Sequence, residues 1–293
     1  MYSQIASNKR KTYIIMFFFL LFAGFLGWFA GYYFGDVSIT VIVLSVALMY
    51  ALFSYFNAAK IAVAVNGAHP IEQKDNPRLY KIVENLAITE GMPMPKVYVI
   101  NDPAPNAFAT GRDPNHAIVA ATTGLLEIMD DQELEGVMAH ELGHVKNYDI
   151  RVMMIVFALV TVIALLSDII LRMTFFSRDD DSRSSGGNVL VIVGLVAMIL
   201  APLAATLLKL AISRKREYLA DATGALTTRY PDGLARALEK IGQYGSSLRR
   251  QNSSTAHLFF ANPLKGGSIA SLFSTHPPIE DRINRLREMS TSL

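Results

Sequence analysis

The sequence predicts a mainly α-helical membrane protein in which four transmembrane helices are combined with one soluble α+β domain. Of the 293 residues, 52% are hydrophobic and only 18% are charged, whereas about a quarter are charged in a typical soluble protein. Four segments are long and apolar enough to cross a bilayer, which takes about 20 mainly apolar residues. The polar residues lie mostly before and after the last two segments. We therefore expect the soluble domain to be split around spans three and four.

The four apolar segments are predicted to pair into two hairpins. Residues 12–35, 37–59 and 188–208 contain no charged side chain, and residues 152–171 contain only Asp168. The alternative is that these segments are buried core helices, but four core helices of this length are not expected in one chain. The predicted organisation is a transmembrane hairpin (1–59), the first half of the soluble domain (60–151), a second transmembrane hairpin (152–208) and the second half of the domain (209–293).

The first apolar segment is predicted to be an uncleaved transmembrane helix. It is too long for the core of a secretory signal peptide, and the second segment follows at once after a turn at Asp36. Basic residues at 9–11 precede the first segment, and basic residues at 214–216 follow the fourth. By the positive-inside rule we expect both termini and the soluble domain in the cytoplasm.

Composition excludes several classes of function. The chain has no cysteine, which rules out a disulfide framework, thiolate catalysis and any cysteine-based metal site. A formal net charge of +2 gives no indication of a nucleic-acid partner. No Gly-rich phosphate loop is present, so no nucleotide is expected. An ATP-driven partner that extracts substrates cannot be identified from the sequence.

Residues 140–144 form the motif H-E-x-x-H. On a helix, His140 and His144 lie one turn apart on the same face, where both can bind one metal ion and Glu141 can act as general base. Asp130 and Glu133 precede the motif at the spacing of a capping box, which predicts that helix. The alternative is a surface helix with two incidental histidines.

A catalytic zinc site takes three protein ligands and leaves one position for water. Without cysteine, the third ligand must be His, Asp or Glu, and Glu217 is the best candidate. Asp221 follows it by one helical turn, where its carboxylate can accept the N–H of a zinc-bound imidazole. Two solvated acids are the alternative. We therefore predict one Zn²⁺ per chain, bound by His140, His144 and Glu217.

The positions of the ligands relative to the spans support this set. His144 lies seven residues before Arg151, where span three begins, and Glu217 lies eight residues after Lys209, where span four ends. If both helices continue from the bilayer, the ligands stand about 10–12 Å above its edge at similar height.

On these motifs the chain resembles the HtpX family of membrane zinc metallopeptidases, relatives of the CaaX prenyl-protein zinc peptidases. The resemblance covers the paired N-terminal segments, residues 106–111, the helix from His140 to Asp149, residues 217–221 and His276 with the two prolines after it. It implies a zincin-like metallopeptidase domain that faces the cytoplasm from the bacterial inner membrane. It also implies stress-linked turnover of damaged membrane proteins.

The resemblance implies roles for further residues. Asn106, Ala107, Phe108 and Ala109 would form an edge strand along the active-site cleft, next to a strand at 117–122 and joined to it by a turn at 111–115. A free edge can take an extended peptide as an added strand. A purely structural hairpin is the alternative.

His276 would lie near the site and could stabilise the oxyanion, with a structural hydrogen bond as the alternative. Asn147 and Asp149 are candidates for orienting the metal ligands. No role is assigned to the other histidines, His69, His116 and His257.

The predicted activity is zinc-dependent hydrolysis of peptide bonds in membrane-protein substrates at the lipid bilayer. An intramembrane protease is disfavoured, because acidic residues and Lys146 surround the motif. A transporter or receptor is disfavoured, because Asp168 is the only charge within the spans. A CaaX-type prenyl-protein peptidase and a non-proteolytic membrane protein with an incidental metal site remain as alternatives.

Overall fold

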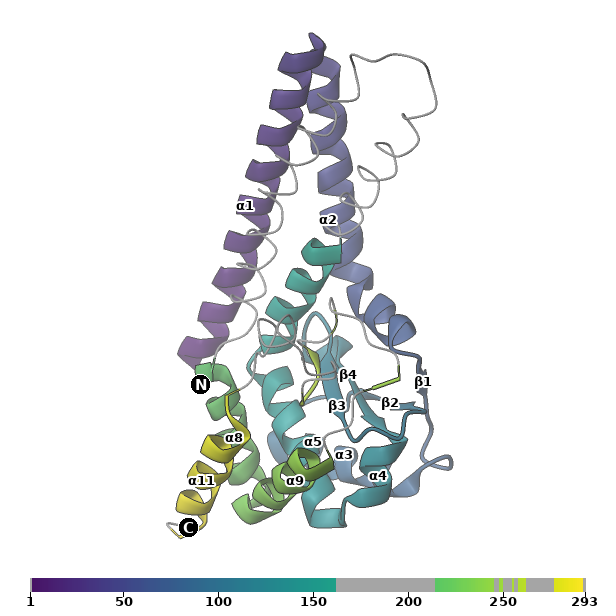
Figure 1. Cartoon of the computed structure of the whole chain (residues 1–293), viewed down its shortest axis with the longest axis vertical. Helices are drawn as coiled ribbons and strands as arrows, with labels where there is room; N and C mark the ends of the chain where they lie inside the picture. Colours follow the sequence, from purple (N-terminus) through teal and green to yellow (C-terminus); the bar gives the residue numbers. More distant parts are fainter. Residues whose placement is uncertain are drawn as a thin grey trace.

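The computed structural model describes residues 2–161, 214–244, 248–249, 255, 258–261 and 277–291. Two long helices, α1 (Tyr2–Phe34) and α2 (Val37–Val65), form an antiparallel hairpin that projects from a domain containing the sheet and the shorter helices (Figure 1). The described part of the chain is mainly helical with one small sheet, as the sequence predicts.

The turn between α1 and α2 is tight. Gly35 has a φ of 69°, and the Asp36 carboxylate accepts a hydrogen bond of 2.8 Å from the Ser38 amide, which caps α2. Close contact continues below the turn, where the Thr40 hydroxyl donates to the Gly27 carbonyl at 3.1 Å. A Cβ at Gly31 would lie only 2.8 Å from that hydroxyl oxygen. Glycine is therefore required for the two helices to approach this closely.

The hairpin exposes a band of large apolar side chains. All but four of the exposed large hydrophobic residues in the described ranges lie between Tyr13 and Phe56. Among these ranges no single helix is both long and apolar enough to count as a membrane span. The segments Thr40–Phe53 and Tyr55–Val65 of α2 qualify together, by length and composition, across a bend of 66°. The described helices therefore do not confirm the four predicted spans.

The domain contains a four-stranded sheet. Its strands are β1 (Ala68–Pro70), β2 (Lys96–Ile100), β3 (Ala107–Thr110) and β4 (Ile118–Thr122), in the order β1-β2-β4-β3. β2 pairs with β4 in parallel, and the other neighbours are antiparallel. The predicted strand pair is present, with β3 at the edge and a turn between β3 and β4 that includes a short 3-10 helix, Pro114–His116.

The two faces of the sheet have different partners. Side chains at alternate positions, such as Val97, Ala109 and Val119, pack against α3 (Pro77–Glu90) and α5 (Asp131–Lys146) in the main core. The opposite face, which includes Phe108, packs against the end of α2 and against residues 153–158. The sheet therefore joins the helical domain to the base of the hairpin.

Five helices complete the described domain with α3: α4 (Thr123–Ile128), α5, α8 (Arg214–Thr228), α9 (Pro231–Tyr244) and α11 (Ile279–Ser290). The predicted capping box at Asp130 and Glu133 is present at the start of α5. A Cβ at Gly224 of α8 would lie 3.1 Å from the backbone nitrogen of His140. The absence of a side chain there allows α8 to approach α5 at the H-E-x-x-H motif.

The condition on which the ligand heights were calculated is not met by the motif helix. The calculation assumed a helix that continues into span three, but α5 ends at Lys146 and a turn at 147–148 separates it from a new helix at 149–161. Tyr148 has a φ of 60°, which a continuous right-handed helix does not allow. Residues 162–208, which include the second half of span three and all of span four, lie outside the described residues.

Candidate metal centre

Helices α5 and α8 bring His140, His144 and Glu217 together in the interior. All three are buried, and their ligand atoms lie within 4.8 Å of one another. The two Nε2 atoms are 3.1 Å apart, and the Glu217 carboxylate oxygens lie 3.5 Å from His144 Nε2 and 3.9 Å from His140 Nε2. Ligand atoms around a tetrahedral zinc ion with bonds near 2.0 Å are about 3.3 Å apart. The triad is therefore close to the size that a zinc ion needs.

Two carboxylates determine which nitrogen of each imidazole faces the centre. The Nδ1 of His140 lies 2.9 Å from the Asp221 carboxylate, and the Nδ1 of His144 lies 3.1 Å from that of Asp149. A carboxylate is an acceptor, so each Nδ1 carries the proton and each Nε2 presents a lone pair. Three electron-rich ligand atoms thus converge on one point. This arrangement suits a bound cation and is repulsive without one.

The charges around the centre lead to the same conclusion. Among the residues that the structure describes, four buried carboxylates lie at or beside the centre and two buried guanidinium groups contact them, which leaves an excess of two negative charges when the imidazoles are neutral. One divalent cation would neutralise this excess. The residues are Glu141, Asp149, Glu217 and Asp221 on the acidic side and Arg216 and Arg282 on the basic side.

The pKa values of the two imidazoles are shifted in opposite directions. Burial lowers the pKa of His140 to about 4 despite its bond to Asp221. Burial also acts to lower the pKa of His144, but the hydrogen bond with Asp149 and the charge of Glu217 outweigh it and raise the pKa to about 9. The acids beside His144 therefore favour positive charge at this position, which a bound cation would supply.

Arg282 is a part of the site that the sequence did not reveal. It projects from α11, is buried, and donates to both Asp221 oxygens at 2.7 and 2.9 Å. Burial alone would raise the pKa of Asp221, but Arg282 and His140 together hold it at about 2. The guanidinium also lies 4.8 Å from the centre of the Phe260 ring, which packs edge-on against His140 at 5.0 Å. Arg282 therefore orients the carboxylate that orients His140.

Asp149 is held by a group from the far end of the chain. The Asn8 side chain of α1 donates to the Asp149 carboxylate at 2.7 Å and to the Asn147 carbonyl at 2.9 Å. The guanidinium of Arg216 lies 3.7 Å from the same carboxylate. No local pattern in the sequence links Asn8 to the motif, because the contact depends on the docking of the hairpin against the domain.

The turn after α5 explains how Asp149 reaches His144. Residues five apart on a continuous helix point about 140° away from each other. The positive φ of Tyr148 reverses the chain locally and brings the Asp149 carboxylate back to His144. Such strained backbone is concentrated at functional sites. Asn147 ends α5, and within the described residues its side-chain amide has no hydrogen-bond partner.

The other predicted site residues have different outcomes. Glu141 is buried on α5 between the two histidines, and its charge contributes to raising the pKa of His144 and of Arg282. His276 lies outside the described residues, so its expected role is not addressed.

The edge strand differs from expectation in one respect. Ala107, Phe108 and Ala109 lie in β3, and Asn106 immediately precedes it. This edge was expected to be free, but Phe108 forms a bridge with Phe259, and the Phe260 amide donates to the Ala107 carbonyl at 2.8 Å. The Asn106 side chain also exchanges two hydrogen bonds with the backbone of Ala261. A short segment of the chain itself therefore occupies the outer edge of β3.

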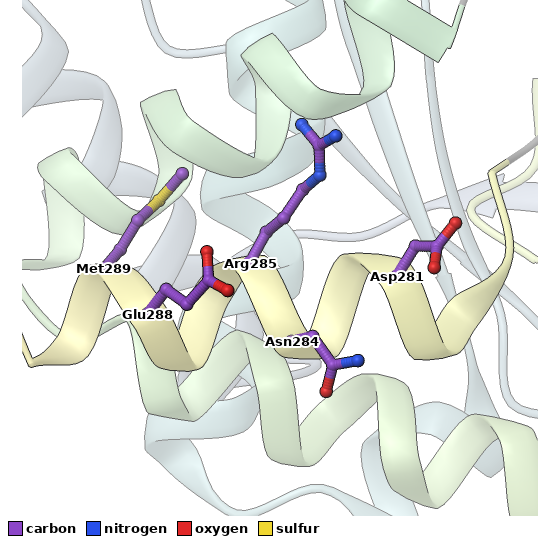
Figure 2. Close-up of a pocket in the computed structure, with 5 residues that line it drawn as sticks. All are labelled: Asp281, Asn284, Arg285, Glu288 and Met289. Atoms are coloured by element: carbon purple, nitrogen blue, oxygen red, sulfur yellow. The ribbon is translucent and has the colours of Figure 1, made fainter.

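A hollow on the surface lies apart from this buried centre. Five residues of α11 line a space of about 640 Å³, and none of the three candidate ligands is among them: Asp281, Asn284, Arg285, Glu288 and Met289 (Figure 2). The guanidinium of Arg285 lies 3.8 Å from the centre of the Tyr218 ring on α8. We assign the chemistry to the buried centre, because its ligand atoms converge and those of this hollow do not.

Comparisons with known proteins agree with this centre. Residues 73–290 match the model of peptidase family M48. The "Protease HtpX homolog" of Tropheryma whipplei (strain Twist) is 55% identical over 289 residues, covering 99% of this chain and 98% of the relative. The protein of the same name from Dictyoglomus thermophilum is 47% identical over 290 residues, covering 98% and 94% respectively.

A solved structure has a similar fold. The crystal structure of S. mikatae Ste24p has a TM-score of 0.51 with this chain, at 21% sequence identity, covering 98% of this chain and 67% of that one.

Proposed function

The chain belongs to peptidase family M48, and from this premise we propose that it is a membrane-bound zinc endopeptidase whose metal is held by His140, His144 and Glu217. The observation that carries the assignment is the buried convergence of two imidazole lone pairs and one carboxylate. The excess of two negative charges around them supports a divalent ion. Imidazole and carboxylate ligands at this spacing suit zinc.

The other catalytic roles belong to side chains of the protein itself. When bound, zinc would supply Lewis-acid activation of a water molecule and of the scissile carbonyl. Glu141 takes a proton from the attacking water and returns it to the leaving amine nitrogen. Asp221 and Asp149 hold the histidines in the tautomer that leaves both Nε2 lone pairs free. We assign His276 to stabilising the oxyanion, in line with the family resemblance.

We also propose that four spans anchor the enzyme in the bacterial inner membrane, with both termini and the peptidase domain in the cytoplasm. The domain would be split into residues 60–151 and 209–293 around spans three and four. The exposed apolar band from Tyr13 to Phe56 supports a hairpin within lipid. Basic residues at 9–11 and 214–216 support the orientation.

The proposed substrates are damaged or misfolded membrane proteins, cut during protein quality control and stress. An extended stretch of such a protein would add to the edge of β3. Because Phe259–Ala261 occupies part of this edge, the substrate would have to displace it or pair beyond it, towards Thr110.

The test combines metal analysis with proteolysis. Glu141→Gln keeps the size of the side chain and removes its basicity, so we expect unchanged zinc content and a rate of peptide cleavage lower by about 10² to 10⁴. A chelator should abolish cleavage by the unmodified protein, and added Zn²⁺ should restore it. If the Gln variant loses its zinc, Glu141 is a ligand and the assigned roles are wrong.

A further inference from the structure

A cavity of about 350 Å³ lies where the base of the hairpin meets the sheet. Residues 55–60 of α2 form one wall, and the start of β2, the start of β4 and the turn after β3 form the other. None of its lining residues belongs to the metal centre. We propose that this cavity binds the phosphate headgroup of an anionic phospholipid.

The cavity carries positive charge without matching acids. Lys60 and Lys96 both line it and are exposed, and neither forms an ion pair with a described residue. Arg112 lines it as well, but it is paired with Asp113 at 3.5 Å. Within the described ranges, these two ammonium groups therefore have no acidic partner. Clusters of basic residues next to the cytoplasmic end of a membrane helix bind anionic lipid headgroups.

The position of the cavity corresponds to the boundary between lipid and water. On α2 the exposed apolar band ends at Phe56, and Lys60 follows one turn later. Phe56 itself lines the cavity and lies 5.2 Å below the Arg112 guanidinium. Tyr55 and Tyr98 add aromatic surface with a polar tip, which is typical of residues at the headgroup level.

This position favours a lipid over a free anion. Lys60 and Lys96 line the cavity together with Phe56, whose exposed side chain belongs to the apolar band on α2. A lipid could place its phosphate between the lysines and its acyl chains along that face. Free phosphate would use the charges alone. Because the bilayer position of the hairpin belongs to the proposed function, the test measures lipid binding without any proteolysis, and the two proposals can fail separately.

The experiment uses the full chain in detergent, stripped of lipid, with binding of short-chain phosphatidylglycerol measured by native mass spectrometry. Lys60→Gln/Lys96→Gln removes both free charges, and we expect it to weaken binding by roughly tenfold or more. The matched control is Lys74→Gln/Lys81→Gln, which removes two charges from another surface hollow and should leave binding unchanged. Zinc content and circular dichroism establish that both variants are folded.

Further probes identify the ligand. Phosphatidylcholine should bind at least tenfold more weakly than phosphatidylglycerol if the cavity selects anionic headgroups. Inorganic phosphate and glycerophosphoglycerol carry the anion without acyl chains and should not compete at equal concentration. Any one of four results would overturn the proposal. Two concern the ligand: phosphatidylcholine binds as tightly as phosphatidylglycerol, or either free anion competes. Two concern the protein: the Lys60/Lys96 variant binds as tightly as the unmodified protein, or the control variant loses as much affinity as the Lys60/Lys96 variant.

Discussion

Two histidines one helical turn apart form a metal site when each ring presents an unprotonated nitrogen to the same point. Here Asp221 and Asp149 come from different elements and each contacts the Nδ1 of one ring. Glu217 then completes the triad from α8. The carboxylate that binds the metal and the one that orients His140 lie one turn apart on the same helix, so a single helix face performs both tasks.

Removing these two carboxylates should have different effects. Glu217→Ala deletes a ligand, and we expect most of the zinc to be lost. Asp221→Ala deletes an orienting partner and should weaken zinc binding by about 10 to 100-fold. It should also lower the free energy of unfolding by about 3 to 5 kcal/mol, because Arg282 is left buried without its charge partner. Zinc titration and thermal unfolding measure the two effects.

Asp232→Ala, at a partly exposed position on α9 away from the centre, is the control and should change neither quantity. Full zinc and full activity in Glu217→Ala would mean that the third ligand is another residue, with His276 the first candidate.

The local part of this centre could be predicted from the sequence, and the long-range part could not. The spacing of His140, His144, Glu217 and Asp221 within helical segments determines which side chains share a face. Arg282 and Asn8 reach the site from α11 and α1, so their positions depend on packing between distant helices. No spacing rule relates residues 61 or 141 positions apart.

At the scale of elements, the break after α5 is the main difference from the sequence-based fold. The height of the ligands was calculated from the sequence on the condition that the helix is continuous, and the pattern of hydrophobicity contains no sign of a left-handed residue at Tyr148. The Tyr148 ring lies under two cations, 4.5 Å from Lys9 and 5.0 Å from Arg151. These contacts stabilise a backbone conformation that costs about 1 to 2 kcal/mol for a non-glycine residue.

The segment on the edge of β3 leads to a prediction about access. Asn106→Ala removes two hydrogen bonds that hold Ala261, each contributing about 1 kcal/mol. If substrate takes the place of this segment, the variant should cleave an unfolded peptide with a kcat/KM higher by up to about tenfold. Peptide kinetics with the purified protein measure it. A lower kcat/KM would indicate that the Asn106 side chain binds the substrate directly.

The matched control for this variant is Asn85→Ala on the exposed face of α3. Its kcat/KM should equal that of the unmodified protein. An increase in both variants would point to general loosening of the domain rather than to release of the edge.

At the scale of the whole molecule, the proposed topology can be tested with tags. A tag after residue 293 should report the cytoplasmic side, and a tag near Gly186, between predicted spans three and four, should report the opposite side. Protease protection in spheroplasts and in inverted vesicles measures this. If both tags report the same side, one assigned span does not cross the membrane and the split domain cannot assemble as proposed.

The distance of the metal centre from the apolar band determines which substrates it can reach. Asn8 contacts Asp149 beside His144, and the band begins five residues later at Tyr13. Five helical residues rise about 8 Å, so the centre lies on the order of 10 Å from the band. This estimate along α1 replaces the one that assumed a continuous α5, and it gives a similar height of the metal centre above the membrane. A centre this low should meet chains anchored in the same membrane more often than soluble ones, since tethering raises their effective concentration.

The corresponding experiment uses a series of anchored substrates that differ only in the spacer between their span and a cleavable, unfolded segment. Cleavage should be fastest at short spacers that still reach the centre, and it should fall as the spacer lengthens, because effective concentration decreases with linker length. A substrate with a folded helix at the cleavage position is the control and should resist cleavage, since strand addition requires an extended chain. Equal rates at every spacer length, or equal cleavage of the untethered segment, would contradict selection by proximity to the membrane and leave the zinc chemistry intact.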